Sequence, residues 1–368
     1  YALMLAAGNM DLEAAAWMGR SLGQCVSSLF QSPEGDLIAG GWDGRMRMWN
    51  SQGDAIWTIE AGDRVSDFAR QDDYLFATCG LHVSAFSYSS GEQLWSHALE
   101  GSADELTIHN GQVMVVSSVY DIEHNDFLES AVWCYSFTGE LQWVSRMSER
   151  PWTIFSRKDE LVIGLGRPQC GLGVIGDDGG IEYEQLASES PVMCGVNGAK
   201  RQLFGHADGT ISTGKGKLLL KQERGIESLS CTSHGFVCAL DDGNLAAYDA
   251  KGKIMWSNAG HPIVEQAEGC TIGQENSHWT ARWDGLVGYL EVRNSLTGEI
   301  LANMQSSQIR SMQGNSQTIA IGCDDGKVLL WQSELLTRRI SEDIPAQQPS
   351  VDSRKSALQA KLRALRDK

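Results

Sequence analysis

The chain has little proline, too few basic residues to balance its acidic ones, and no long hydrophobic run. Its 368 residues include 7 Pro, and 30 Lys and Arg face 47 Asp and Glu, for a formal net charge of −17. Nucleic-acid affinity comes mainly from clustered Lys and Arg, so this balance argues against a nucleic-acid partner. No run of about eighteen apolar residues occurs, so no membrane-spanning helix is expected.

Patterns typical of catalytic and metal sites are also missing. The 9 Cys show neither CxxC spacing nor an adjacent pair, and most lie in apolar runs, so we interpret them as reduced core thiols of a cytoplasmic protein. No Ser/His/Asp arrangement, HExxH or P-loop is found, and the 8 His are scattered. We therefore predict no catalytic residue, no metal site and no cofactor.

The chain is rich in Gly (40) and Trp (12), and both recur in a repeat. A Gly is followed four residues later by Trp or another apolar residue, at intervals of about 41 residues, the length of one four-stranded propeller blade. The glycines of this motif are Gly53, Gly91, Gly139, Gly179, Gly216, Gly252 and Gly298. We expect the Trp of the motif to be a blade-packing residue and not a ligand-stacking one, and its predicted copies are Trp17, Trp57, Trp95, Trp143 and Trp256.

Each repeat contains four short β-type runs. In the first repeat these runs cover 25–30, 37–40, 45–49 and 55–59. Turns of the Asp-Gly type separate the second run from the third in five repeats, and they suit two-residue hairpins because they tolerate positive φ. A calcium site is the alternative for these acids, but they are dispersed one turn to a repeat.

Two families of propeller are similar to this sequence. The segments Gly41–Trp49 and Cys323–Trp331 resemble the end of a WD repeat, whereas Ser136–Trp143 and Tyr248–Trp256 resemble the blade motif of quinoprotein-like (PQQ-type) propellers. The resemblance covers about residues 13–332 and does not choose between the families. It implies an all-β fold with a single eight-bladed propeller, with seven blades as the alternative.

The last repeat lacks a fourth strand, because the residues after Trp331 contain neither the Gly nor the Trp of the motif. An N-terminal strand at about 13–22 places Trp17 before the first complete run. We predict that this strand completes the final blade and closes the ring, which removes open strand edges. The propeller is thus expected to span 1–340.

Two insertions interrupt the repeats between the second and third strands, at 120–127 and 166–171. Insertions in repeat proteins map to loops on one face, which is often the binding face. The predicted partner-binding residues there are Tyr120, Asp121, Glu123, His124, Asp126 and Arg167. The alternatives are loops that are merely tolerated and, for His124, a metal ligand.

The C-terminal end differs from the propeller in charge and in pattern. Residues 341–351 are expected to be a linker, and 352–368 a basic amphipathic C-terminal helix with six basic and two acidic residues. Its stripe of Leu358, Leu362 and Leu365 is too short to be stable alone and should dock on a surface. The propeller, an anionic membrane and a partner's groove are the possible surfaces, and we favour the groove; the alternative is a frayed tail with incidental charge.

These observations together favour an interaction protein. We predict a non-catalytic scaffold or adaptor subunit that binds protein partners through one rim and the C-terminal helix. The propeller is expected to be monomeric within a larger complex, without nucleic-acid or membrane partners. The alternative is a quinoprotein-like dehydrogenase or a small-ligand-binding propeller.

Overall fold

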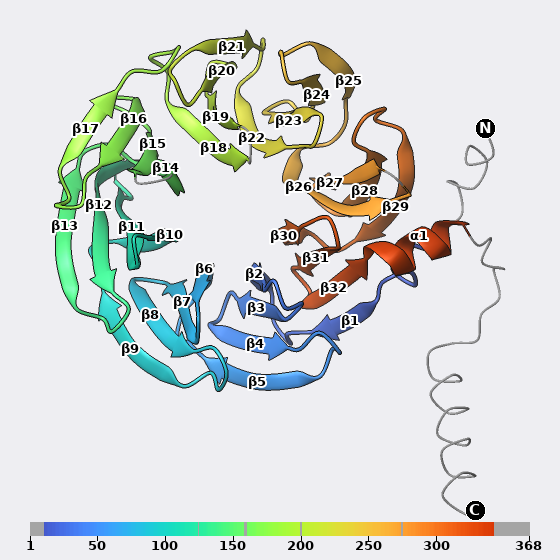
Figure 1. Cartoon of the computed structure of the whole chain (residues 1–368), viewed down its shortest axis with the longest axis horizontal. Helices are drawn as coiled ribbons and strands as arrows, with labels where there is room; N and C mark the ends of the chain where they lie inside the picture. Colours follow the sequence, from blue (N-terminus) through green and yellow to red (C-terminus); the bar gives the residue numbers. More distant parts are fainter. Residues whose placement is uncertain (1–10, 124, 158–159, 199–200, 274, 342–368) are drawn as a thin grey trace, which may run out of the picture.

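A ring of eight four-stranded antiparallel sheets makes up the protein (Figure 1). The structure is a computed structural model, and it describes residues 11–123, 125–157, 160–198, 201–273 and 275–341. Each sheet is one blade, and its first strand lies innermost. The prediction of an all-β propeller with eight blades is confirmed.

The first four blades along the chain follow one another without a break in strand order. Their strands are β2 (Val26–Gln31), β3 (Leu37–Gly41), β4 (Arg45–Trp49) and β5 (Ala55–Glu60); β6 (Val65–Gln71), β7 (Tyr74–Cys79), β8 (His82–Ser87) and β9 (Gln93–Ala98); β10 (Ser102–His109), β11 (Gln112–Asp121), β12 (Asp126–Ser136) and β13 (Leu141–Met147); and β14 (Pro151–Arg157), β15 (Glu160–Leu165), β16 (Gly171–Ile175) and β17 (Ile181–Glu184).

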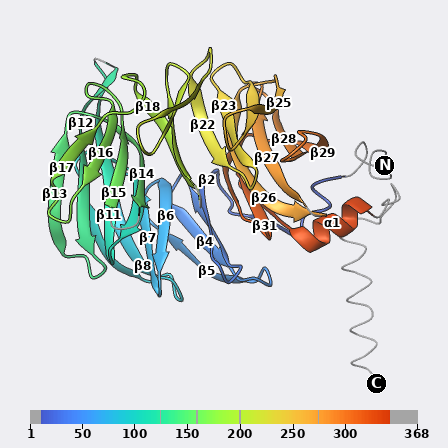
Figure 2. The same cartoon turned by 45° about the horizontal axis from the view of Figure 1, so that its top comes forward.

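The next three blades repeat this order, and the eighth draws on both ends of the chain (Figure 2). Their strands are β18 (Val192–Gly198), β19 (Arg201–His206), β20 (Thr210–Thr213) and β21 (Leu218–Lys221); β22 (Ile226–Cys231), β23 (Gly235–Leu240), β24 (Leu245–Asp249) and β25 (Ile254–Asn258); β26 (Ile263–Ile272), β27 (Glu275–Trp283), β28 (Gly288–Asn294) and β29 (Ile300–Ser306); and β30 (Ile309–Gly314), β31 (Thr318–Cys323), β32 (Lys327–Gln332) and β1 (Met18–Ser21).

The N-terminal strand closes the ring as the sequence predicts. Strand β1 pairs antiparallel with β32, so that Met18 lies opposite Leu330 and Ser21 opposite Lys327. The residues just before β1 also contribute, because Leu12 is fully buried and its carbonyl accepts the indole N–H of Trp331 at 2.8 Å. Blade eight is therefore held by both chain ends.

A Trp on the outer strand of one blade packs on the Gly of the next blade's turn. The Trp57 ring lies against Gly91, where an added Cβ would come within 2.9 Å of the ring, and Gly91 has φ of 74°. The indole N–H of Trp57 donates to the Tyr88 carbonyl in that same neighbouring blade, at 2.9 Å. The equivalent hydrogen bonds run from Trp95 to Phe137 at 2.8 Å and from Trp256 to Ser295 at 3.0 Å. The motif therefore joins neighbouring blades.

Trp17 does not take part in this packing, so its predicted role is wrong. Trp57 lies opposite Met48 in the sheet, and the residue that occupies the matching place in β1, opposite Leu330, is Met18. The Met18 sulfur lies 3.3 Å from the place of a Cβ on Gly53, whereas Trp17 is 38% exposed. The repeat motif therefore aligns with Met18 and not with Trp17. A shift of one residue along a strand moves a side chain to the opposite face of the sheet.

Most of the core lies between blades. Apolar side chains of β3 and β4, such as Ile38 and Met46, pack with Phe68 and Phe86 of the next blade. The largest cluster joins the seventh and eighth blades, where the rings of Trp279 and Trp331 are 4.9 Å apart. Each blade therefore depends on its neighbours for burial.

A short helix, α1 (Ser333–Ser341), follows β32, where the sequence suggested only a missing fourth strand. Leu336 of α1 is fully buried in the cluster between the seventh and eighth blades. The Arg339 guanidinium donates to the carbonyls of Ala14 and Ala16 at 2.8 and 3.2 Å, so α1 also holds the segment before β1. The predicted linker from 342 onward and the predicted helix 352–368 lie outside the described residues.

Candidate functional site

One face of the ring carries all the loops between second and third strands, together with the loops that connect consecutive blades. We call this face the rim. The five Asp-Gly turns lie on it as predicted, with positive φ at Gly44, Gly209, Gly243, Gly285 and Gly326. Over the described residues of these loops there are thirteen acidic and four basic side chains, so the rim is acidic.

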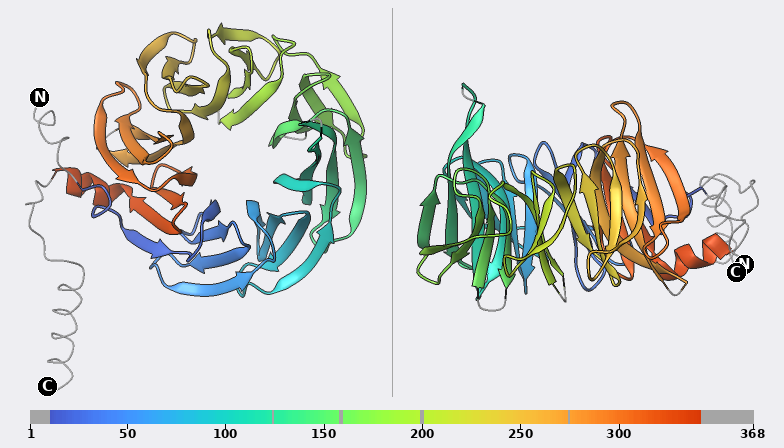
Figure 3. Two further views of the ribbon diagram at one scale, coloured as in Figure 1. Left: turned by 180° about the vertical axis from the view of Figure 1, so that it is seen from behind. Right: turned by 90° about the horizontal axis from the view of Figure 1, so that it is seen from above.

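The insertion at 120–127 extends two strands into a hairpin that rises above the ring (Figure 3). Strands β11 and β12 pair out to Tyr120 opposite Phe127 and Asp121 opposite Asp126. Ile122 is 86% exposed and Leu128 is 58% exposed. The hairpin thus presents apolar side chains to solvent on a regular β-structure.

An arginine from the next blade fastens the base of the hairpin. The Arg150 guanidinium carbon lies 3.7 Å from the ring centre of Phe127 and 4.0 Å from that of Trp152. Arg150 also forms an ion pair with Asp104 at 3.7 Å. Tyr120 packs edge-on to Phe127 with ring centres 5.0 Å apart. Cation–π contacts of this kind contribute about 1–2 kcal/mol when they are partly desolvated, so the hairpin base is ordered.

The second insertion lies beside this anchor. The Gly166 amide donates to the Arg150 carbonyl at 2.8 Å, and Arg167 follows as an exposed residue. The residues that follow Arg167 line a cavity of about 420 Å³, which is formed by residues 168–171 and 183–189. The Tyr183 hydroxyl donates to the buried Glu149 carboxylate at 3.3 Å near this cavity. The structure therefore brings the two insertions together through Arg150.

The predicted partner-binding residues of the rim fall into three groups. Tyr120, Glu123, Asp126 and Arg167 are exposed, and Asp121 is partly buried. His124 lies outside the described residues, as do the tail residues Leu358, Leu362 and Leu365. The structure thus places the described rim residues on one face, as their position between second and third strands implied.

Sequence reasoning missed a second exposed cluster on the rim. Trp42 is 46% exposed, the Arg64 guanidinium carbon lies 4.1 Å from its ring centre, and Leu81 of the next blade is 53% exposed. The available signal was the position of Trp42 beside the Asp43-Gly44 turn instead of inside a strand. Trp and Arg are the residue types that dominate binding energy at protein interfaces.

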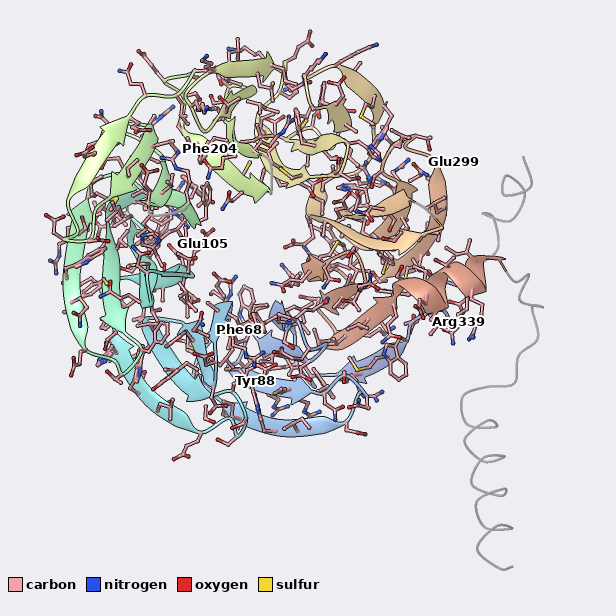
Figure 4. All side chains as sticks on the ribbon, viewed as in Figure 1. Phe68, Tyr88, Glu105, Phe204, Glu299 and Arg339 are labelled. Atoms are coloured by element: carbon pink, nitrogen blue, oxygen red, sulfur yellow. The ribbon has the colours of Figure 1, made fainter. Side chains whose placement is uncertain are left out.

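Carboxyl groups lie between the innermost strands, and Figure 4 shows Glu105 on the inner side of the ring. Burial, reinforced by the negative charge of Asp67, raises the pKa of Glu105 to about 8. Burial likewise raises the pKa of Asp67 to about 6 and that of Glu265 to about 8. Asp67 accepts the Leu106 amide at 3.0 Å and Glu105 the Ile154 amide at 3.2 Å. Asp67 and Glu105 therefore join neighbouring blades.

The raised pKa values predict stability that falls as pH rises. In the folded state Glu105 keeps a proton that the same residue releases near pH 4.5 in the unfolded chain. The contribution of this proton to the free energy of unfolding is therefore complete below about pH 4.5 and is lost as pH rises through about 8. We expect Glu105→Gln to raise the free energy of unfolding by about 1–3 kcal/mol at pH 9 and by less at pH 5. Urea unfolding over this range measures the effect.

Glu100→Gln is the matched control for that prediction. Glu100 is exposed, and its hydrogen bond to Arg146 lowers its pKa instead of raising it. This variant should gain no stability at pH 9. If the gain of Glu100→Gln over the unsubstituted chain grew with pH as much as the gain of Glu105→Gln, the assignment would be contradicted.

Other chemical features of the described residues are few. No group of three or more His, Cys, Asp or Glu among them is placed to hold a metal ion. The nine cysteines are all free, and burial raises the pKa of the Cys79 and Cys134 thiols to about 12. In the part of the chain that the structure describes, no helix has the length and apolar character needed to cross a membrane.

Comparison with known proteins identifies the repeat type. A family model described as outer membrane protein assembly factor BamB matches residues 43–179, and one described as WD domain, G-beta repeat, matches residues 19–50. No curated protein sequence matches this chain. These matches confirm the WD-like and PQQ-like repeats that the motifs indicated.

Similar solved structures agree with these matches. The crystal structure of BamB from Moraxella catarrhalis is 13% identical, with a TM-score of 0.68 over 86% of this chain and 99% of that one. Sqt1 from Saccharomyces cerevisiae is 12% identical, with a TM-score of 0.69 over 87% and 99%. The computationally designed Ika8 protein is 18% identical, with a TM-score of 0.69 over 86% and 98%. At such identities the similarity establishes the fold alone.

Proposed function

Because this chain is a β-propeller built of WD-like and PQQ-like repeats, we propose that it is a non-catalytic platform that binds protein partners through its rim. The observation that carries the proposal is the hairpin formed by β11 and β12. It projects from the ring, exposes Ile122 and Leu128, and is fastened at its base by Arg150.

The physical argument rests on exposed apolar area and rigidity. A fully exposed isoleucine forgoes about 2 kcal/mol of burial, and a partner that covers it recovers this free energy. Because the hairpin base is already ordered, binding loses less conformational entropy there than on a mobile loop. The Trp42, Arg64 and Leu81 cluster adds interface-type residues on the same face.

Two further parts of the proposal lie beyond the rim. We propose that residues 352–368 add a second contact, with Leu358, Leu362 and Leu365 entering a groove of the partner, because the segment carries a charge of +4 beside an acidic body. The nine free cysteines fit a reducing compartment, which supports the cytoplasm as its location.

Shortening the hairpin tests the proposal. Replacing residues 121–126 by Asn-Gly keeps the Tyr120–Phe127 pair and closes it with a two-residue turn. We expect proteins cross-linked to the full chain in its native cells to be recovered at least about tenfold less with this variant, since a hot spot is worth roughly 2 kcal/mol. The thermal unfolding midpoint should stay unchanged.

A double substitution on the ring's outer strands is the control. Ile56→Ser with Leu141→Ser removes similarly exposed apolar side chains, 48% and 51% exposed, away from the rim. It should leave the cross-linked proteins unaltered. If the hairpin variant retains all partners, or if the control loses the same ones, the rim is not the binding surface.

A further inference from the structure

A basic patch interrupts the acidic surface on the face opposite the rim. It consists of Lys215, Lys217, Lys251 and Lys253, with Arg201 between them. The lysines belong to the turns that connect β20 to β21 and β24 to β25, in the fifth and sixth blades. All four lysines are exposed. A local excess of positive charge in a chain of net charge −17 requires explanation.

Contacts between the two blades hold the patch together. The Arg201 guanidinium donates to the Ala250 carbonyl at 2.8 Å, which links the fifth blade to the turn of the sixth. In that turn, a Cβ on Gly252 would lie 3.4 Å from the Leu219 carbonyl oxygen of β21. The two turns are therefore side by side, as the neighbouring positions of β21 and β25 in Figure 1 also show.

The four lysines lack the ion pairs that several exposed cations elsewhere on the ring have. Lys221 pairs with Asp208 at 2.9 Å and Arg310 with Asp324 at 2.9 Å, for example. Among the residues that the structure describes, no carboxylate forms an ion pair with any of the four.

One acid lies inside the patch. The Asp249 carboxylate accepts the backbone amides of Lys251 and Lys253 at 2.8 and 2.9 Å, so it shapes the turn. Counting Asp249 against the four lysines and Arg201 leaves a charge of +4.

Each turn also ends in an exposed aliphatic side chain. Leu218 follows Lys217 and is 60% exposed, and Ile254 follows Lys253 and is 53% exposed. The sequence Lys-Gly-Lys-aliphatic thus occurs twice, on adjacent blades and at the same place in each blade. The patch combines four ammonium groups with two apolar side chains.

We propose that this patch binds an acidic peptide segment that carries apolar side chains among its carboxylates. Carboxylates would contact the lysine ammonium groups, and the apolar side chains would cover Leu218 and Ile254. Salt screens electrostatic interactions beyond about 8–10 Å. A short acidic segment on the patch is therefore attracted by the lysines and only weakly repelled by the acidic residues farther away. A nucleic acid or an anionic membrane would extend over the acidic surroundings and be repelled, and a nucleic acid would also leave the aliphatic pair uncovered. The patch is separate from the rim, so this inference does not depend on rim binding.

The test uses a fluorescently labelled synthetic peptide that repeats Asp-Glu-Leu-Gly, titrated with the full chain and followed by anisotropy. We expect saturable binding that weakens with salt. Lys251→Glu with Lys253→Glu should weaken it at least about tenfold, and Leu218→Ser with Ile254→Ser about fivefold, since both charge and apolar contact contribute. Thermal unfolding of each variant checks that the fold is kept.

Three controls make the outcome specific. Arg167→Glu with Arg224→Glu changes the net charge by the same amount on the rim and should leave binding intact. A peptide with Asn and Gln in place of the acids should not bind, and shortening the hairpin should have no effect on the acidic peptide. The proposal is overturned if the acidic peptide does not bind, if the rim charge variant weakens it equally, or if phosphatidylserine vesicles or an oligothymidine strand bind the patch in its place.

Discussion

A chain that starts at Leu22, without β1 and the segment before it, is expected to lose at least about 5 kcal/mol of unfolding free energy. Leu12 and Met18 are 0% and 5% exposed, and loss of each such side chain costs about 2–5 kcal/mol. The truncation also leaves β32 as an open edge and removes the acceptor of the Trp331 indole N–H. Since domains of this kind are stable by about 5–15 kcal/mol, the truncated chain should be largely unfolded or aggregated.

Guanidinium unfolding followed by Trp fluorescence, together with size-exclusion chromatography, measures this loss. A synthetic peptide of residues 11–22 added to the truncated chain should restore part of the folded signal, because it supplies the missing strand. Within the intact chain, Met18→Ala should lower the free energy of unfolding by about 2–4 kcal/mol. Trp17→Ala, at the exposed neighbouring position, should change it by less than about 1 kcal/mol. A monomeric truncated chain with the unfolding midpoint of the full chain would show that β1 does not close the ring.

Trp57→Ala is expected to lower the free energy of unfolding by about 3–5 kcal/mol. The Trp57 side chain is 8% exposed and fills the space against Gly91 of the next blade, so its removal leaves a cavity between two blades. Its indole N–H also donates to the Tyr88 carbonyl. Chemical unfolding at constant pH measures the difference.

Two variants separate the contributions to this effect. Trp57→Phe keeps an aromatic ring and removes the hydrogen bond to Tyr88. It should lower the free energy of unfolding by about 1–2 kcal/mol, which is less than the loss in Trp57→Ala. Trp42→Ala removes a rim tryptophan that is 46% exposed and should cost within about 1 kcal/mol. Equal losses in Trp57→Ala and Trp42→Ala would refute the role of Trp57 in joining the blades.

The candidate site was predictable in part. The insertion at 120–127 is visible because it lengthens one repeat, and its position between the second and third strands places it on the rim. That Arg150 fastens its base is not visible, because the contact joins Phe127 to a residue of the next blade. Trp42 and Leu81 were missed for the same reason, since the repeat pattern says which residues form strands and little about which turn residues stay exposed.

The sequence by itself predicted eight blades with seven as the alternative, the strand order within each blade and the turns that join the strands, and the structure settled the number at eight. These features depend on local backbone preferences and on a repeat of constant length, and both are written in neighbouring residues. Only the tertiary structure decided that Trp57 packs on Gly91 and that Met18 occupies the place predicted for Trp17. It also decided the raised pKa of Glu105 and the placement of two lysine turns side by side. Each of these joins adjacent blades or the two ends of the chain, and burial between blades exists only when the ring is closed.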